Sequence, residues 1–156
     1  MPYLGYVINY DDLVLQLHQA IKNSRINFIP VDSPAEPQAG TPNRIRANGH
    51  HYKARVTVVS DGNRPTQLHK DYNQHALLAT VQSSLAKTQW AYVRFTTGGP
   101  LALLPHPNQS DCYAVVWCNT PTRTHYLKSI SPAQFNNELL AAFGARLGQL
   151  KLISER

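Results

Sequence analysis

The sequence is poor in acidic residues and in cysteine, and it has no long apolar run. Its 156 residues include 9 Asp and Glu against 15 Lys and Arg, which gives a formal net charge of +6. No apolar stretch is long enough to span a membrane, and the first residues lack the basic and then apolar pattern of a signal peptide. One domain usually takes about 100 to 200 residues. We therefore expect a single soluble domain over residues 1–156, located in the cytoplasm.

The two cysteines and the seven histidines do not form a metal-binding pattern. Cys112 and Cys118 lie in a run of β-forming residues, where their sulfurs would be about 20 Å apart at about 3.3 Å per residue, too far for a disulfide. No CxxC motif is present, and no histidines have ligand spacing. We expect neither a metal site nor a Ser/His/Asp or Cys/His catalytic set, and we interpret the histidines as surface or loop residues: His18, His50, His51, His69, His75, His106 and His125.

The basic residues are scattered, apart from a loose group formed by Arg44, Arg46, Lys53 and Arg55. Proteins that bind nucleic acids usually cluster Lys and Arg on one face or one helix. The pattern therefore favours a solvated positive surface and no nucleic-acid partner. A basic module that binds polyanions is one candidate function, and we rank it third.

The first half of the chain predicts one helix and several short β segments. Asp11 is a candidate cap for a helix over 11–23, in which Leu13, Val14, Leu17 and Ile21 share one face. Residues 25–30 and 52–60 have the composition of strands. Residues 31–51 are rich in Pro, Gly, Asn and Ala, which indicates a loop or a hairpin excursion.

The second half predicts an antiparallel meander followed by a helix. Strands are expected at 75–83, 89–96 and 112–118, with GGPLALLPH between the last two, and the 112–118 strand is apolar on both faces, as a central strand would be. Ser131 and Gln134 form a capping box for a helix whose apolar face includes Phe135, Leu139, Ala142, Phe143 and Leu147. We predict an α+β fold: a mostly antiparallel sheet of about five to seven strands with two main helices packed on it.

Few residues suggest chemistry by themselves. Asp61-Gly62 directly follows the apolar run VTVVS, where a carboxylate and a bare backbone can lie beside a nucleotide, although Asp-Gly is also a common structural turn. The aromatic residues Trp90, Tyr92, Phe95, Tyr113 and Trp117 either line a site for a planar ring or an apolar chain, or pack in the core.

Four separated blocks resemble the FAD-dependent aromatic hydroxylases of ubiquinone biosynthesis. They are RFT at 94–96, GPLALLP at 99–105, YAVVWC at 113–118 and FGARLG at 143–148, and VTVVSDG is similar to a strand and turn of the same family. The resemblance implies a substrate domain like that of p-hydroxybenzoate-hydroxylase-type flavoproteins. It also implies that the whole enzyme reduces FAD with NAD(P)H and transfers one oxygen atom from O2 to the ring of a polyprenyl phenol.

The resemblance implies roles for six residues. Asp61 and Gly62 are expected to contact the cofactor, and Phe95, Pro100, Leu103 and Trp117 are expected on the substrate side. The strand in GGPLALLPH would present either Leu101 and Leu103 or Ala102 and Leu104 to the substrate. No catalytic acid or base is predicted, because the flavin carries the chemistry.

The family's GxGxxG segment and its later flavin segment have no counterpart in the sequence. We therefore expect a middle fragment that binds no cofactor and is inactive alone. The whole enzyme is expected to lie at the inner face of the membrane, and the exposed edges favour a homo-oligomer. The second alternative for function is a non-catalytic domain that binds a lipid-like quinone precursor or organises a biosynthetic complex.

Overall fold

The computed structural model describes residues 5–33, 35–38, 41–58, 60 and 70–156. These residues form helices and mostly antiparallel sheets, so the predicted α+β class is confirmed. The contacts between Cα atoms divide the chain into two compact units, one of Met1–Leu13 with Lys70–Arg156 and one of Val14–His69. Each unit is described by itself below.

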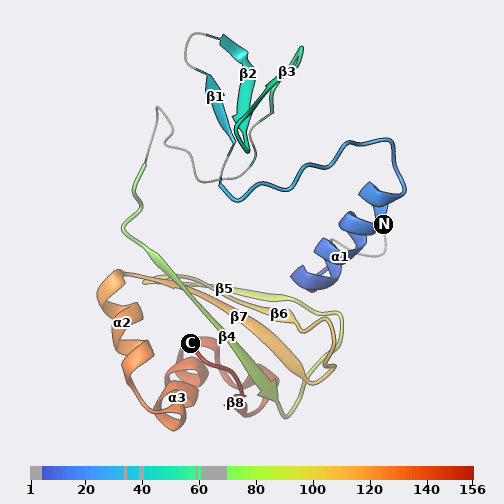
Figure 1. The fold of residues 1–156 in the computed structure, drawn as a ribbon. Helices are drawn as coiled ribbons and strands as arrows, with labels where there is room; N and C mark the ends of the chain where they lie inside the picture. Colours follow the sequence, from blue (N-terminus) through green and yellow to red (C-terminus); the bar gives the residue numbers. More distant parts are fainter. Residues whose placement is uncertain (1–4, 34, 39–40, 59, 61–69) are drawn as a thin grey trace. The chain divides into compact units, whose positions relative to one another are not determined.

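A five-stranded antiparallel sheet forms the larger unit (Figure 1). Its strands lie in the order β5-β6-β7-β4-β8. The predicted central position of the 112–118 strand is confirmed, because β7 lies between β6 and β4. The predicted meander is wrong at its first strand, since β4 pairs with β7 and not with β5. The strands are β4 (His75–Ser83), β5 (Tyr92–Thr96), β6 (Gly99–Pro105), β7 (Cys112–Asn119) and β8 (Leu150–Leu152).

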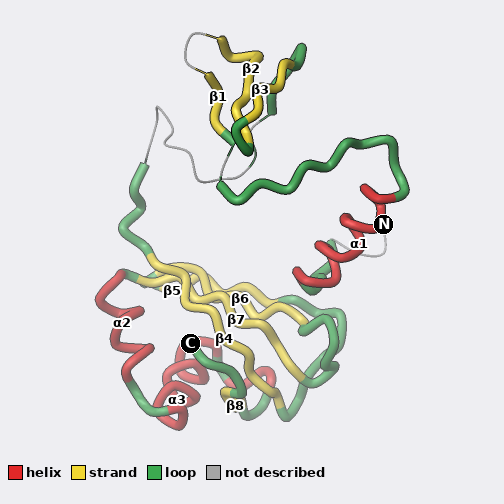
Figure 2. The backbone as a smooth tube through the Cα atoms, viewed as in Figure 1, coloured by secondary structure: helices red, strands yellow, loops and turns green. Residues whose placement is uncertain are grey.

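Helices α2 (Pro121–Ser129) and α3 (Pro132–Phe143) lie on the same side of this sheet (Figure 2). Alternate residues of each long strand point toward them, and these residues form one core with the helices and with the 3-10 turn Ala145–Leu147. Trp117 of β7 meets Phe135 of α3 edge to face, with the ring centres 6.2 Å apart. The core comprises Leu77, Ala79, Val81, Leu101, Leu103, Tyr113, Val115, Trp117, Leu127, Phe135, Leu139, Phe143, Leu147 and Leu150.

The capping box predicted for α3 is confirmed. The Ser131 hydroxyl accepts a hydrogen bond from the Gln134 N–H, and the Gln134 side chain accepts one from the Ser131 N–H. The helix ends at Gly144, whose φ of 87° is readily adopted only without a side chain. Helix α2 and strand β8 were not predicted, because a nine-residue helix with a weak apolar face and a three-residue strand leave little periodicity in the sequence.

The smaller unit contains a three-stranded antiparallel sheet in the order β1-β2-β3. Its strands are β1 (Glu36–Gln38), β2 (Thr41–Ala47) and β3 (His50–Lys53). Asn48 and Gly49 join β2 to β3 with φ angles of 49° and 76°, the left-handed pair that a tight hairpin turn requires. The region 31–51 was predicted to be either a loop or a hairpin excursion, and it contains β1, β2 and the first two residues of β3.

Helix α1 (Tyr10–Lys22) begins one residue earlier than its predicted cap. Asn9 caps it in place of Asp11, because the Asn9 side-chain oxygen accepts hydrogen bonds from the backbone N–H groups of Asp11 and Asp12. The strands predicted at 25–30 and 52–60 are wrong, except that residues 52 and 53 are the last two residues of β3. The described residues of 26–30 and 54–58 pair with no strand.

Candidate functional site

The most unusual surface of the larger unit is the face of the sheet opposite α2 and α3. Cross-strand register brings Val93, Ala102, Val116 and Leu78 into one row over four strands. Phe95 and Pro100 pair in the next row of the same face, two residues further along each strand. We call this surface the open face and define it by its apolar members: Ala76, Leu78, Val93, Phe95, Pro100, Ala102, Leu104, Ala114, Val116 and Cys118.

The open face is apolar, although α2 and α3 lie on the other side of the sheet (Figure 2) and several of its side chains are exposed. Leu78 is 62%, Val93 56% and Phe95 87% exposed. An antiparallel sheet with one solvated face normally carries polar side chains on that face. A contiguous apolar face of this kind usually marks a contact with a ligand or with another protein surface. The open face is therefore the candidate functional site.

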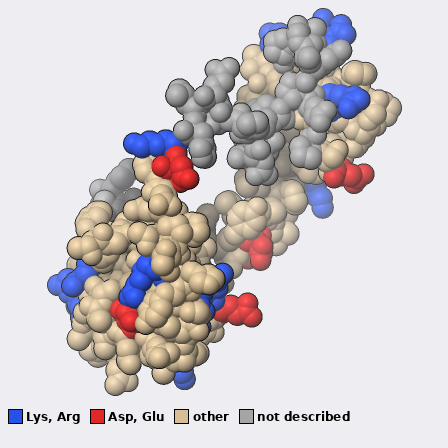
Figure 3. All heavy atoms as spheres, turned by 90° about the vertical axis from the view of Figure 1, so that its left-hand side faces the viewer, with Lys and Arg blue, Asp and Glu red and all other residues tan. Residues whose placement is uncertain are grey.

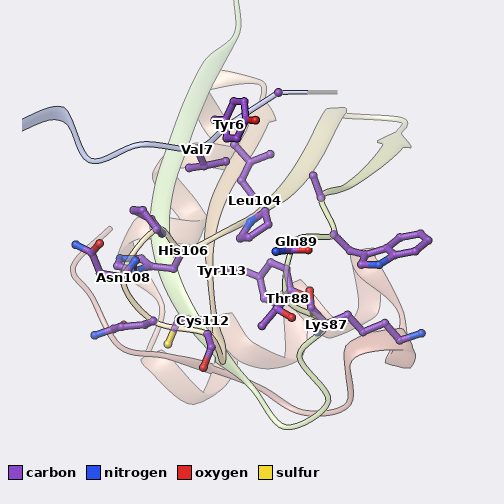
Figure 4. A pocket seen from close by; sticks show the side chains of 17 residues that line it. Tyr6, Val7, Lys87, Thr88, Gln89, Leu104, His106, Asn108, Cys112 and Tyr113 are labelled. Atoms are coloured by element: carbon purple, nitrogen blue, oxygen red, sulfur yellow. Dashed lines mark hydrogen bonds between the residues drawn. The ribbon is translucent and has the colours of Figure 1, made fainter. Parts of the chain in front are cut away.

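A pocket of about 1190 Å³ lies at one end of the open face, where the β6–β7 loop meets the β4–β5 loop (Figure 4). Tyr6 and Val7 of the N-terminal segment also line it. The buried Tyr113 fixes one wall, because its hydroxyl donates to the Lys87 carbonyl oxygen at 2.9 Å and accepts from the Lys87 N–H at 3.0 Å. Burial raises the pKa of Tyr113, so this hydroxyl stays protonated and structural at neutral pH.

The ionisable groups beside the pocket favour binding over nucleophilic chemistry. Burial, together with the neighbouring Asp111, raises the pKa of the Cys112 thiol, and a thiol in that state is a poor nucleophile. A hydrogen bond from Gln82 lowers the pKa of Asp111. Among the residues that the structure describes, no group of three His, Cys, Asp or Glu side chains could hold a metal ion.

The predicted substrate residues are split between the two faces of the sheet. Phe95 and Pro100 lie side by side on the open face. Leu103 and Trp117 lie in the core under the helices and are 0% and 2% exposed. Of the two pairs considered for the GGPLALLPH strand, Ala102 and Leu104 face the open side and Leu101 and Leu103 face the core. Asp61 and Gly62 lie outside the described residues.

Sequence reasoning missed Leu78, Val93 and Val116 of the open face, and it placed His106 among surface histidines. The signal that could have found them is the register between strands. Once Leu101 pairs with Trp117 and Leu77 with Trp117, the alternate residues of all three strands must share the other face.

The basic residues singled out in the sequence lie partly on one hairpin of the smaller unit. Arg44 pairs with Lys53 and Arg46 with His51, so these four residues share one face of β2 and β3. Elsewhere, Lys and Arg side chains are scattered among other residues on the surface that Figure 3 shows.

Comparison with known proteins adds a biochemical context to this geometry. The chain is 38% identical over 88 residues to the mitochondrial ubiquinone biosynthesis monooxygenase COQ6 of Caenorhabditis elegans, a match that covers 54% of this chain and 19% of that protein. It is 27% identical over 119 residues to the ubiquinone hydroxylase UbiL of Rhodospirillum rubrum, covering 70% of this chain and 27% of that protein. The chain is similar to hydroxylases of ubiquinone biosynthesis.

A third relative is the uncharacterized protein slr1300 of Synechocystis, 33% identical over 85 residues, or 54% of this chain and 20% of that protein. The chain therefore spans less than a third of the length of each of these curated relatives. No family model matches the sequence. Among the described helices, none is long and apolar enough to cross a membrane.

Proposed function

We propose that this chain supplies the substrate wall of an FAD-dependent, NAD(P)H-using monooxygenase that hydroxylates a polyprenyl phenol in ubiquinone biosynthesis. The observation that carries the proposal is the exposed apolar face of β4 to β7. The similarity to ubiquinone hydroxylases supports the reaction class. The four sequence blocks support a member like 2-octaprenyl-6-methoxyphenol hydroxylase.

The open face suits a substrate with a long isoprenoid tail. Its members are aliphatic, aromatic, proline and cysteine side chains on four adjacent strands, so a flexible apolar chain can bury surface along them without leaving a polar group unpaired. A wall of this kind also keeps water from the ring that is to be hydroxylated. The chain's own contribution to the reaction is thus binding, orientation and exclusion of water.

The described helices do not fit the pyrophosphate of FAD. A dinucleotide is usually held by free backbone N–H groups at a helix N-terminus. Helix α1 carries Asp11 and Asp12 in its first turn, and these charges would repel a pyrophosphate. Helices α2 and α3 begin with proline, which has no N–H, and their caps Thr120 and Ser131 already occupy a further donor. We therefore assign none of these three helices to the pyrophosphate.

The test is binding of a short-chain substrate analogue to the chain itself. We expect farnesylphenol to bind wild-type protein and Val93→Ser to weaken this binding by about three- to tenfold, because the change removes apolar contact area worth roughly 1 kcal/mol. Isothermal titration calorimetry measures both affinities. A matched control is Leu85→Ser, since Leu85 is 61% exposed but lies in the turn after β4, beside Gly148 and off the open face.

Equal weakening by the two serine variants, or no binding to the wild type, would contradict the proposal. FAD and NADPH are then added to the same samples. We expect NADPH to remain unconsumed, because none of the three described helices fits a pyrophosphate. Turnover of NADPH with farnesylphenol would show that the chain builds a flavin site elsewhere.

A further inference from the structure

The polarity of the open face changes along its strands. The row formed by Gln82 and Cys112 carries the polar amide of Gln82, and the next row contains the Thr80 hydroxyl beside Ala114 and Leu104. The two rows beyond it are wholly apolar and end on β5 at Val93 and Phe95. The open face therefore has one polar end and one apolar end.

His106 extends the polar row. Its backbone N–H donates to the Cys112 carbonyl oxygen at 2.9 Å, so the pairing of β6 with β7 continues one residue beyond Pro105. Strand alternation then puts His106 on the same face as Leu104, Ala102 and Pro100. His106 is half-buried and lines the pocket of about 1190 Å³ together with Leu104 and Gln89 (Figure 4).

One hydrogen bond sets the tautomer of His106. Its Nδ1 atom accepts a hydrogen bond from the backbone N–H of Asn108 at 3.3 Å. An imidazole nitrogen that accepts carries no proton, so the neutral ring carries its proton on Nε2. Within the part of the chain that the structure describes, no group accepts a hydrogen bond from Nε2. The Nε2–H group is thus a donor available at the edge of the pocket.

We infer that the open face binds its ligand in one direction, with an oxygen-bearing aromatic ring in the pocket at His106 and an apolar tail running toward Phe95. The Nε2–H group of His106 donates to the ring oxygen. The tail follows β6 from His106 to Pro100, about 20 Å at about 3.3 Å per residue. This inference rests on the proposed function, because it takes the prenyl phenol as the ligand of the open face.

Two ligands that differ only in oxygen test the inference. Farnesylphenol and farnesylbenzene share the tail and the ring, and only the phenol can accept a hydrogen bond. In the variant His106→Phe, we expect affinity for farnesylphenol to fall about three- to tenfold, as for the loss of one hydrogen bond, and affinity for farnesylbenzene to stay unchanged. His106→Gln keeps an N–H donor and should recover part of the loss. His125→Phe is the matched control, because His125 is exposed on α2 on the other side of the sheet.

Trp90 reports where the ring lies, because it is 64% exposed and lines the same pocket. A farnesylphenol that carries a nitro group on its ring should quench Trp90 fluorescence in wild-type protein. Three results would overturn the inference while leaving the apolar wall intact. They are an equal fall in the affinity of His106→Phe for both ligands, an unchanged affinity for both ligands, and absence of Trp90 quenching. Failure of farnesylphenol to bind the wild type would overturn the proposed function and the inference with it.

Discussion

At the scale of single residues, Tyr113 links the core to the pocket wall through its hydroxyl. Because burial raises the pKa of Tyr113, the folded protein resists ionisation of this side chain, whereas the unfolded chain ionises it near pH 10. By linkage, the neutral Tyr113 side chain contributes fully to the free energy of unfolding below about pH 10. This contribution is lost as the pH rises toward the pKa that Tyr113 has in the folded protein. We therefore expect the free energy of unfolding to decrease above about pH 10.

The variant Tyr113→Phe should show less of this decrease, and at pH 8 it should be about 1 to 3 kcal/mol less stable, because the Lys87 N–H and carbonyl lose their partner. Urea unfolding between pH 8 and 11 measures both effects. Tyr10→Phe makes the same substitution at an exposed position, 76% accessible, and serves as the control. A parallel pH dependence in the two variants would refute this role.

Single residues also show what could not be predicted from the sequence, namely which side chains of a strand face the core. The run Leu101-Ala102-Leu103-Leu104 is apolar at every position, so no alternation tells which residues face the core. Pairing with β7 decides it: Leu103 is fully buried and Leu104 is only partly so. The sequence therefore identified the right strand for the candidate site, but it could not choose between neighbouring leucines.

At the scale of elements, α3 shows how a local signal can be predictive. Its capping box depends on two residues three positions apart, so no distant contact is needed to recognise it. Ser131→Ala should lower the free energy of unfolding by about 0.5 to 2 kcal/mol. Thermal and urea unfolding measure the change, with Ser110→Ala in the exposed β6–β7 loop as the control. Equal effects of the two substitutions would mean that the cap is not stabilising α3.

The pairing between strands was harder to predict from the sequence than the strands themselves. The strands at 75–83, at 99–105 and near 112–118 follow from β-forming residues and turn signals, and the structure contains all three. The sequence places β4 next to β5 because they are consecutive, whereas the structure pairs eight residues of β4 with β7. Non-local pairing of this kind depends on which faces become buried together, and no short stretch of residues encodes it.

At the scale of the whole larger unit, the open face should make the protein self-associate. Two copies can bury these apolar faces against each other at high concentration. Phe95→Lys should lower the average mass measured by sedimentation equilibrium without unfolding the protein, because Phe95 is 87% exposed. Leu85→Lys places the same charge off the open face and should leave the mass unchanged. An unaltered mass in Phe95→Lys would show that association uses another surface.

The pairing of β4 with β7 also has a consequence during synthesis of the chain. Strand β4 ends at Ser83 and its main partner ends at Asn119, so 36 further residues must be made before that pairing can be completed. At about 5 to 20 residues per second, the ribosome needs roughly 2 to 7 s for this stretch. During that interval β4 presents two unpaired edges and the apolar side chains of Leu77, Leu78 and Val81. We therefore expect a nascent chain of this length to bind a chaperone that shields apolar strands until β7 emerges.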